Sequence, residues 1–341
     1  MRILLGMSGG LDSTFSALKL KEEGHSVEGA VLIMHSYTDI DSARAAAREV
    51  GIKLHEIDCR SLFEEKVIPD FIEQYRNGKT PNPCIVCNRE VKFKALYDYA
   101  MANGFDKIAT GHYAKIKKRE CDGRAVICRA ADEKKDQSYM LWRLTPQIID
   151  KLVLPLSELT KEEIRIEAAK RGLSSATVRD SQEICFIPSG DYGSYIEERI
   201  GKSKEGDFID SDGNILGRHK GILHYTVGQR KGLGIALGSR AFITDINPET
   251  NRITLSFSAK ENDSFTVSDI VFSGMDKMRK GEKKELFVKV RYQAPPVPAT
   301  VDFLSSGRAK VTLFSKAKSV TAGQSAVFYD GEELAFGGFI D

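Results

Sequence analysis

Residues 6–13 read Gly-Met-Ser-Gly-Gly-Leu-Asp-Ser, and they constrain the fold more than any other stretch of the chain. They follow an apolar run, Arg2–Leu5, which predicts a strand. They precede an amphipathic run, Thr14–Glu23, which predicts a helix that ends at Gly24. The backbone N–H groups of such a glycine turn are free to converge on an anion, and the helix N-terminus adds partial positive charge. The octapeptide therefore predicts an anion-binding turn between a strand and a helix.

This turn lacks the Gly-Lys-Ser/Thr ending of a Walker A loop, so it carries no phosphate-binding lysine of its own. It resembles instead the pyrophosphatase-type loop of enzymes that adenylate a carbonyl oxygen and release pyrophosphate. A glycine turn after a strand can also be purely structural, but Ser-Gly-Gly-x-Asp-Ser favours nucleotide binding. The loop residues predicted to bind ATP are Gly6, Met7, Ser8, Gly9, Gly10, Leu11, Asp12 and Ser13.

The pattern of the sequence changes near residue 200. Before it, strand-like runs alternate with helical ones, which is typical of a doubly wound parallel sheet of the adenine nucleotide hydrolase-like kind. After it, short alternating strands separated by turn signals predict a small β domain and then a β-barrel. The predicted domains are residues 1–195, 196–260 and 261–341. The expected strands include Ser26–Ile33, Lys53–Asp58 and Lys107–Thr110, and the expected helices include Ser42–Val50, Ser61–Tyr75 and Asn88–Ala102.

Composition excludes several classes of protein. The chain has 341 residues, 41% of them hydrophobic and 29% charged, and no run of about 18 apolar residues predicts a membrane span. A strand at the very N-terminus leaves no room for a signal peptide, so we expect a cytoplasmic protein. Six cysteines in this length argue against a disulfide framework. The net charge of +2 means that nucleic-acid binding would need local basic patches.

Ligands of doubly wound sheets bind beyond the carboxyl ends of the strands. The second expected strand ends at Met34, a candidate adenine contact, although core packing is the simpler explanation for a lone methionine. The strand near residue 110 brings Gly111 and His112 to the same edge, and Gly111 allows close backbone approach. We therefore add Met34 and Gly111 to the predicted nucleotide site.

A second group of candidate residues lies in Thr80–Glu90, where two prolines hold the chain out of a helix that we expect to start near Cys87. A cysteine at a helix N-terminus close to Arg89 is predicted to have a lowered thiol pKa, which favours a nucleophilic thiolate. Cys185 lies in a short strand-like run and, taken alone, is a small buried hydrophobic residue.

Six short motifs are spread over most of the chain. They are Gly6–Ser13, Pro81–Pro83 with Cys87-Asn88, Gly111–Ala114, Lys135–Tyr139, Ile184–Ile187 and Tyr225–Gly234. In this order they resemble the bacterial and organellar tRNA-specific 2-thiouridylase family. The resemblance implies ATP-dependent exchange of oxygen for sulfur at C2 of the wobble uridine of a tRNA. It also implies Mg²⁺ with the ATP and a sulfur-relay protein as donor.

The resemblance assigns roles to single residues. Asp12 would help to place the metal, Cys185 would carry a persulfide, and Cys87 would be its partner thiol. Cys87 would either release hydrosulfide from the persulfide or close a disulfide with Cys185 after transfer. The implied tRNA contacts are Asn82, Pro83 and Cys84 at the target base, with Lys135, Asp136, Gln137, Arg291 and Tyr292 elsewhere and the C-terminal barrel as a tRNA-contacting domain. A glycine-rich basic cluster supplies candidate phosphate contacts, although these residues could equally form a solvated rim of the β region. The cluster comprises His219, Lys220, His224, Gln229, Arg230 and Lys231.

The chain departs from the family pattern at three places. Cys84 stands where the family most often has Asp, so Cys84, Cys87 and Cys185 could together ligate a [4Fe–4S] cluster with one open iron. The cluster and a persulfide–disulfide relay both remain open, while zinc would need a fourth ligand that the sequence does not offer. The connection after Met34 is short, and Gln182-Glu183 precedes Ile184 where Thr-Gly is usual.

Two other functions compete with tRNA thiolation. One is a different adenylating transferase, such as an amidating synthetase, but no glutaminase-like segment is apparent and paired thiols would have no evident use there. The other is a tRNA-binding protein without catalysis, against which the intact loop and both thiols count. We therefore expect a sulfurtransferase.

Overall fold

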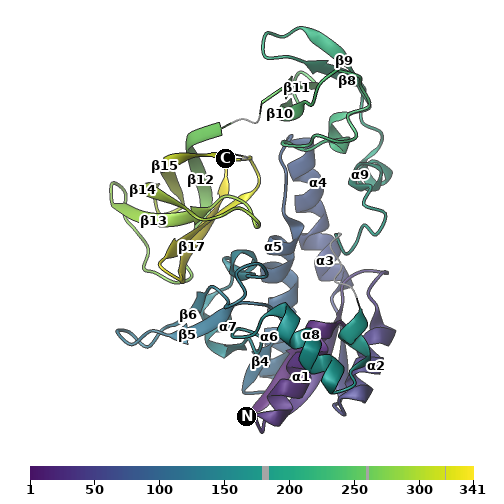
Figure 1. The fold of residues 1–341 in the computed structure, drawn as a ribbon, viewed down its shortest axis with the longest axis vertical. Helices are drawn as coiled ribbons and strands as arrows, with labels where there is room; N and C mark the ends of the chain where they lie inside the picture. The colour runs from purple at the N-terminus through teal and green to yellow at the C-terminus, as the bar shows by residue number, and fades with distance from the viewer. Residues whose placement is uncertain (179–183, 259–260, 319) are drawn as a thin grey trace.

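The computed structural model describes residues 1–178, 184–258, 261–318 and 320–341, and these form three lobes (Figure 1). A parallel sheet flanked by helices comes first, a small β domain follows, and a closed barrel ends the chain. This arrangement confirms the predicted fold class. Within those ranges, no helix is both long and apolar enough to cross a membrane.

The N-terminal sheet has five parallel strands in the order β3-β2-β1-β4-β7. Their bounds are Arg2–Gly6 for β1, Ser26–Ile33 for β2, Leu54–Asp58 for β3, Lys107–Ala109 for β4 and Leu152–Val153 for β7. Side chains alternate between the two faces of a strand, so Ile3 and Leu5 pack into one core while Leu4 packs into another. The central strand β1 is therefore buried on both faces, as the doubly wound fold requires.

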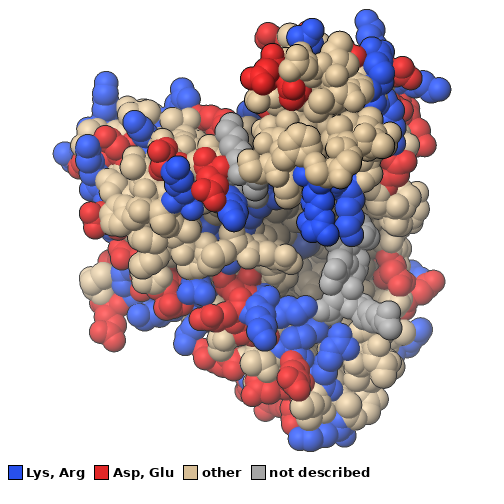
Figure 2. Space-filling view, turned by 45° about the horizontal axis from the view of Figure 1, so that its top comes forward, with Lys and Arg blue, Asp and Glu red and all other residues tan. Residues whose placement is uncertain are grey.

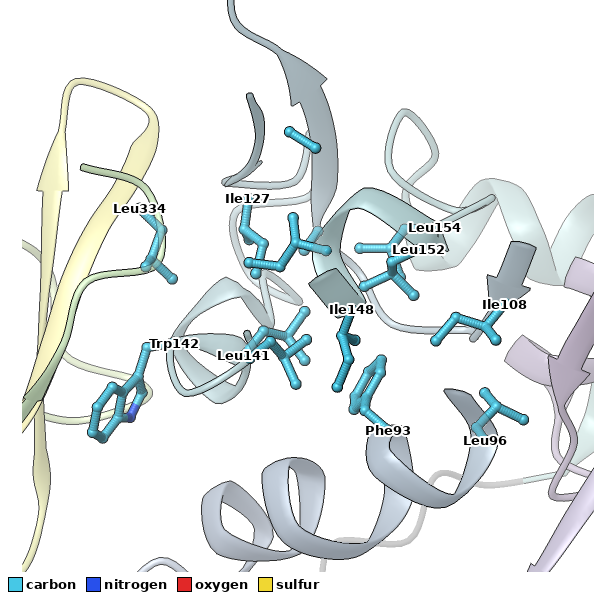
Figure 3. Packing of buried hydrophobic residues seen from close by; sticks show 14 of the residues in the cluster. Phe93, Leu96, Ile108, Ile127, Leu141, Trp142, Ile148, Leu152, Leu154 and Leu334 are labelled. Carbon is cyan, nitrogen blue, oxygen red and sulfur yellow. The ribbon is translucent and has the colours of Figure 1, made fainter. Parts of the chain in front are cut away.

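Helices cover both faces of this sheet. The helices α1 (Leu11–Glu22), α2 (Ile40–Glu49) and α8 (Lys161–Lys170) contribute to the core that contains Ile3. The helices α6 (Phe93–Ala102) and α7 (Pro146–Lys151) contribute to the core that contains Leu4. Figure 3 shows Phe93 and Ile148 of this second core pointing toward each other, with Leu96 pointing toward Ile108. These two cores fix the positions of the strand ends.

Two expected helices differ from the structure. Ser61–Tyr75 is divided into α3 (Arg60–Lys66) and α4 (Ile68–Arg76), because Pro69 lacks an N–H group and disfavours helical backbone before it. The helix expected near Cys87 begins earlier, as α5 (Pro83–Cys87), and continues through a π-helical turn, η1 (Asn88–Lys92), into α6. Proline in the first turn of a helix costs nothing, since that N–H has no intrahelical partner.

The remaining helical segments are η2 (Ser138–Leu141), η3 (Ser174–Thr177) and α9 (Tyr192–Ile200), and a capping box at Thr160 opens α8. The small domain has strands β8 (Gly206–Ile209), β9 (Ile215–His219), β10 (Phe242–Asn247) and β11 (Arg252–Ser256), with the short helix η4 (Ile222–His224). Its sheet order is β10-β11-β8-β9. Figure 1 shows α4 and α9 leading toward this domain.

The C-terminal barrel has six strands, and the pairing of β12 with β17 closes it. Their bounds are Glu261–Val271 for β12, Lys283–Lys289 for β13, Val297–Ser305 for β14, Arg308–Lys318 for β15, Ser325–Asp330 for β16 and Glu333–Ile340 for β17. A hairpin of the first lobe, β5 (Lys115–Lys118) and β6 (Ala125–Cys128), joins the edge of β17 through a single Glu333–Cys128 pair. Sequence analysis did not predict this connection between the first lobe and the barrel.

Trp142 anchors the barrel against the first lobe. Its indole N–H donates to Ser325 Oγ at 3.0 Å, and the side chain is fully buried. A Cβ on Gly337 would lie 2.5 Å from the indole ring, so only glycine permits this approach. Figure 3 shows Trp142 beside the barrel strand that carries Leu334. The barrel and the N-terminal sheet therefore share one packed interface.

Candidate active site

The glycine loop after β1 is held in one shape by its own hydrogen bonds. The N–H of Ser8 donates to Ser13 Oγ at 3.2 Å, and that hydroxyl donates to the Gly10 carbonyl at 3.1 Å. Gly9 has φ +81°, and a Cβ there would lie 2.5 Å from the backbone carbon of Ser42 in α2. The loop therefore needs glycine at position 9 for both its backbone angle and its packing.

The segment after β4 lies directly against this loop. A Cβ on Gly111 would be 2.9 Å from the backbone carbon of Asp12 and 3.0 Å from the N of Ser13. The hydroxyl of Tyr113 donates to Asp12 Oδ1 at 2.7 Å. Tyr113 is in turn held by Gln137, which donates its N–H to the Tyr113 carbonyl at 2.7 Å and accepts the Tyr113 N–H at 2.9 Å. The two adjacent strands thus deliver the predicted nucleotide residues to one edge.

A lysine that sequence analysis did not single out completes this edge. Lys161, the first residue of α8, places its Nζ 2.7 Å and 2.9 Å from the two carboxylate oxygens of Asp12. Its side chain is nearly buried, with 8% of the residue exposed. The capping box at Thr160 signalled the start of this helix, but nothing local pointed from Lys161 to a loop 149 positions earlier.

Met34 links the loop edge to the cysteines. It follows β2, and the thiol of Cys87 contacts its Sδ at 3.6 Å. Both residues belong to a core that also contains Phe63 and Phe186. Met34 is therefore at the end of its strand, as predicted, but its observed partner is a thiol.

The prediction of a lowered pKa at Cys87 is wrong. Cys87 is the last residue of α5, not the first residue of a helix, and only 6% of it is exposed. Burial raises the pKa of its thiol to about 12, because a thiolate loses its hydration there. The positive charge of Lys92 lowers this pKa only in part. Cys87 is therefore a protonated thiol in this structure.

Cys84 and Cys185 differ from Cys87 in being exposed. The pKa of Cys185 is raised, first because the surrounding protein removes part of the water that would hydrate a thiolate, and then because of the nearby Cys84 thiol. Negative charge on Cys84 or Cys185 also raises the pKa of Cys87, so the three thiols share one electrostatic neighbourhood. Lys92 acts in the opposite direction on Cys87 and Cys185. Sequence analysis missed Lys92, although it lies five positions after Cys87 in the same helical run.

The surroundings of Cys185 differ from the expected strand. Residues 184–187 form a turn in which the N–H of Ile187 donates to the carbonyl of Ile184. Phe186 packs against the rings of Phe63 and Phe71 and fixes this turn from one side. Gln182 and Glu183, which depart from the family pattern, lie outside the described residues.

The three cysteines do not form a metal-binding group as placed. Across the described ranges, no three His, Cys, Asp or Glu side chains are gathered where they could hold a metal ion. Cys87 faces the thioether of Met34, whereas Cys84 and Cys185 are exposed. The observed geometry therefore does not fit a cluster ligated by Cys84, Cys87 and Cys185, and we derive no step through one.

The three residues expected to contact the target base differ in how exposed their side chains are. Asn82 is partly buried and donates its Nδ2–H to the Met140 sulfur at 3.6 Å. Pro83 is buried at the start of α5, so it shapes the helix and does not face a substrate. Cys84 is exposed. Of these three residues, only Cys84 has a freely accessible side chain.

Two of the other expected tRNA contacts are structural in this conformation. Asp136 is 3% exposed, and its carboxylate accepts hydrogen bonds from the N–H of Ala130 and from the N–H and hydroxyl of Ser138. Gln137 holds Tyr113, as described above. Burial thus removes Asp136 from the accessible surface, while Lys135 beside it is partly buried.

Arg291 lies where the barrel meets the small domain. Its Nη2 donates to Thr321 Oγ1 at 2.7 Å and to the Val227 carbonyl at 3.3 Å. Burial lowers the pKa of this guanidinium. A cavity of about 620 Å³ opens beside this contact, and its lining includes Lys79, Val227 and Thr321. The ring of Tyr292, the next residue, lies 6.1 Å from that of Tyr139.

The basic cluster of the small domain is only partly accessible. His219 is 2% exposed, and His224 Nε2 donates to a carboxylate oxygen of Glu197 at 2.9 Å, so neither imidazole is an open phosphate contact in this structure. Arg230 and Lys231 are exposed and line a second cavity of about 650 Å³. Figure 2 shows Lys and Arg side chains around the hollow where the lobes meet.

Comparison with known proteins agrees with this architecture. Family models match most of the chain in three parts: a tRNA methyl transferase HUP domain over residues 1–189, a tRNA methyl transferase PRC-barrel domain over 193–256, and an aminomethyltransferase beta-barrel domain over 262–340. The tRNA-specific 2-thiouridylase MnmA 2 of Clostridium botulinum is 43% identical, over 99% of this chain and 98% of that protein. The 2-thiouridylase MnmA of Carboxydothermus hydrogenoformans is 40% identical, over 100% of this chain and 97% of that protein. The chain therefore belongs to the tRNA-specific 2-thiouridylase family.

Proposed function

We propose that this protein catalyses the ATP-dependent exchange of oxygen for sulfur at C2 of the wobble uridine of a tRNA. The observation that carries the proposal is the contact between Cys87 and Met34, because it places one thiol of the expected pair at the end of β2, beside the expected nucleotide edge of the sheet. The names of the full-length relatives support the same substrate and reaction. A small-molecule adenylating transferase would have no use for two thiols beside its nucleotide loop.

The first chemical step activates the base. Uracil O2 attacks the α-phosphorus of ATP, the bond from that phosphorus to the bridging oxygen breaks, and pyrophosphate leaves with the electron pair. The proton on uracil N3 is lost to solvent, so the adenylated base is neutral. Backbone N–H groups of residues 8–10 and the N-terminus of α1 would bind the phosphates. Asp12 would supply the one carboxylate that Mg²⁺ needs when phosphates complete its shell, and the bound ion would neutralise the developing charge.

The second step delivers sulfur. The terminal sulfur of a persulfide on Cys185 attacks C2, AMP leaves, and the base is joined to Cys185 through a disulfide. The Cys87 thiolate then attacks Cys185 Sγ, the bond to the transferred sulfur breaks, and its electrons stay on that sulfur as N3 regains a proton. In the other order, Cys87 first releases hydrosulfide, which attacks C2. Either order leaves a Cys87–Cys185 disulfide, which a dithiol reductant opens.

The exposure of the thiols supports this division of roles. A sulfur-relay protein can reach only an accessible thiol, and Cys185 is exposed while Cys87 is buried. The high pKa of Cys87 keeps it protonated until the site rearranges, which protects the persulfide from early attack. Arg230 and Lys231, which are exposed, supply charge for tRNA phosphates, and we assign further contacts to the barrel of residues 261–341. The base must leave the anticodon stack to reach the thiols.

The test is an anaerobic incubation with unmodified tRNA, Mg-ATP and a persulfide donor that can transfer its outer sulfur to Cys185, followed by mass spectrometry of the nucleosides. We expect 2-thiouridine at the wobble position only. Colourless, iron-free protein that still thiolates tRNA would exclude the cluster route. Neither product nor pyrophosphate from folded protein that binds tRNA would contradict the proposal and favour a tRNA-binding protein without catalysis.

A further inference from the structure

The glycine loop contains no lysine, yet a nearly buried lysine reaches it from a distant helix. We propose that Lys161 is the phosphate-binding cation of this site and that it contacts the two phosphates that leave as pyrophosphate. The inference rests on the proposed function, since it names the group that would bind the leaving part of ATP. It concerns a residue that contacts substrate, with no proton transferred.

The position of the Lys161 ammonium is the first argument. It lies 2.7 Å and 2.9 Å from the oxygens of Asp12, and Asp12 is in the first turn of α1, directly after the loop. The side chain of Lys161 is 10% exposed and that of Asp12 is 33% exposed. The ammonium is therefore at the end of the glycine loop, and the carboxylate is the more exposed member of the pair.

The backbone of Lys161 is fixed from two sides. It follows the capping box, in which Thr160 accepts from the Glu163 N–H and Glu163 accepts from the Thr160 N–H. Its own N–H donates to Asp132 Oδ2 at 3.0 Å, and its Nζ lies 5.9 Å from the centroid of the Tyr113 ring. A lysine loses much side-chain entropy when it is held in one place. Fixing it this firmly gives little stability, because removing an ammonium from water offsets most of the Coulomb gain.

Charge balance is the second argument. Both oxygens of the Asp12 carboxylate accept from the Lys161 ammonium, so the charge of this carboxylate is already balanced before a metal ion arrives. When Mg-ATP arrives, the metal competes with Lys161 for Asp12, while the polyphosphate offers Lys161 a new anion. The Asp12–Lys161 pair is then exchanged for a carboxylate–metal contact and an ammonium–phosphate contact. Other phosphoryl-transfer sites use a lysine on the leaving phosphates in the same way.

The chemical consequence follows from the adenylation step. Negative charge grows on pyrophosphate as its bond to the α-phosphorus breaks. A fixed ammonium hydrogen bond to that oxygen is stronger in the transition state than in bound ATP, so it speeds the step. The contact does not involve the adenosine or the α-phosphate. Loss of Lys161 should therefore weaken binding of pyrophosphate and not binding of AMP.

The experiment measures binding of magnesium pyrophosphate to the full-length protein by calorimetry, for wild type, K161Q, K161M and K161R. We expect K161Q and K161M to weaken pyrophosphate binding by about tenfold or more, the usual loss for a charged hydrogen bond, and K161R to regain part of it. Binding of AMP should change by less than about twofold, the range of ordinary surface effects. The kcat/KM of tRNA-dependent pyrophosphate release should fall by roughly 10- to 100-fold.

A matched control is available on the same helix. Lys170 also pairs with a carboxylate, Glu167 at 2.8 Å, but 66% of its side chain is exposed and it lies at the other end of α8. K170Q should therefore leave pyrophosphate binding unchanged. K161M keeps the buried methylene stem, so it separates loss of charge from loss of packing if K161Q melts at a lower temperature.

Two results would overturn the proposal. One is wild-type pyrophosphate affinity in K161Q and K161M, or no pyrophosphate binding by wild type. The other is an equal loss of AMP and pyrophosphate affinity, because that describes a deformed loop. Pyrophosphate binding needs neither tRNA nor sulfur, so it remains decisive for Lys161 even if wild-type protein makes no 2-thiouridine and the proposed function fails.

Discussion

The two halves of the candidate site are built differently. On the nucleotide side, Asp12 accepts from both Tyr113 and Lys161, and the glycine loop closes on its own hydroxyl groups. On the sulfur side, Cys87 is buried against a thioether while Cys185 is exposed in a turn. The backbone of the first half is fixed by these hydrogen bonds, whereas the two thiols of the second half differ sharply in exposure.

The chemistry that we propose for each half explains the contrast. Transfer of an adenylyl group depends on positioning and on fixed charges, so a rigid loop lowers the barrier. A sulfur relay needs one thiol that a partner protein can reach and a second thiol that stays unreactive until transfer. An exposed cysteine beside a buried, protonated one meets both needs. A rigid glycine loop therefore suits adenylyl transfer, and the unequal exposure of Cys185 and Cys87 suits the sulfur relay.

The largest expected effect comes from C185S. We expect no 2-thiouridine from this variant, since the serine hydroxyl cannot carry a persulfide, while ATP binding stays within about twofold of wild type. Nucleoside mass spectrometry and calorimetry with ATP measure the two halves separately. Thiolation that survives in C185S would remove Cys185 from the mechanism, and lost ATP binding would show that the halves are not independent.

The next effect concerns the reactivity of the thiols. Burial raises the pKa of Cys87 from 9.0 to about 12, so its thiolate fraction near neutral pH is roughly 1,000-fold below that of an ordinary cysteine. We expect Cys185 to react with iodoacetamide at least roughly 100-fold faster than Cys87. Mass spectrometry of timed samples measures this, and unfolded protein, in which all cysteines react alike, is the control.

The same pKa shift has a consequence for stability. A thiol whose pKa is raised by folding stabilises the fold fully below its ordinary pKa of about 9, and this contribution is lost as the pH rises toward 12. C87A should therefore unfold with a weaker pH dependence than wild type between pH 9 and 12. In the labelling experiment above, equal iodoacetamide rates for Cys87 and Cys185 in folded protein would contradict the expected difference in thiol reactivity.

The contrast between the halves also explains what the sequence could predict. Strands β1, β2 and β4 follow from apolar runs, and the loop follows from a local glycine pattern, so the nucleotide edge was foreseeable. Lys161 was not, because its partner lies 149 positions away and only the folded sheet brings them together. The sequence pointed to such a lysine only indirectly, because the predicted phosphate-binding loop contains no lysine of its own.

Burial accounts for the wrong expectations on the other half. Asp136 and His219 look like surface residues in the sequence, yet each is buried with hydrogen-bond partners from its own turn or from the turn between β10 and β11. The lowered pKa predicted for Cys87 assumed a position at a helix N-terminus, whereas the helix starts at Pro83 and burial raises the pKa of the thiol. Polar residue types alone do not indicate whether a side chain faces solvent or a turn.

A smaller effect tests the rigidity of the loop. G9A should raise the KM for ATP about tenfold, because a left-handed backbone costs about 1–2 kcal/mol for alanine and its Cβ would meet the backbone of Ser42. Gly24 is a matched control, with φ +82° but nothing within 4 Å of its Cβ. G24A should lower the melting temperature and leave the KM unchanged. Equal KM values in the two variants would contradict a preorganised loop.

The smallest effect is expected at Cys84, and it tests whether the sulfur half depends on two thiols or three. In a persulfide–disulfide relay Cys84 is a surface neighbour of Cys185, so C84S should change the rate of thiolation by about twofold at most. A [4Fe–4S] cluster would lose a ligand in C84S, and both iron content and thiolation would then fall together. Anaerobic purification of wild type and C84S, with iron and sulfide analysis beside the tRNA assay, separates these outcomes. Because the observed thiols do not form a metal-binding group among the described residues, we expect thiolation by C84S to match wild type.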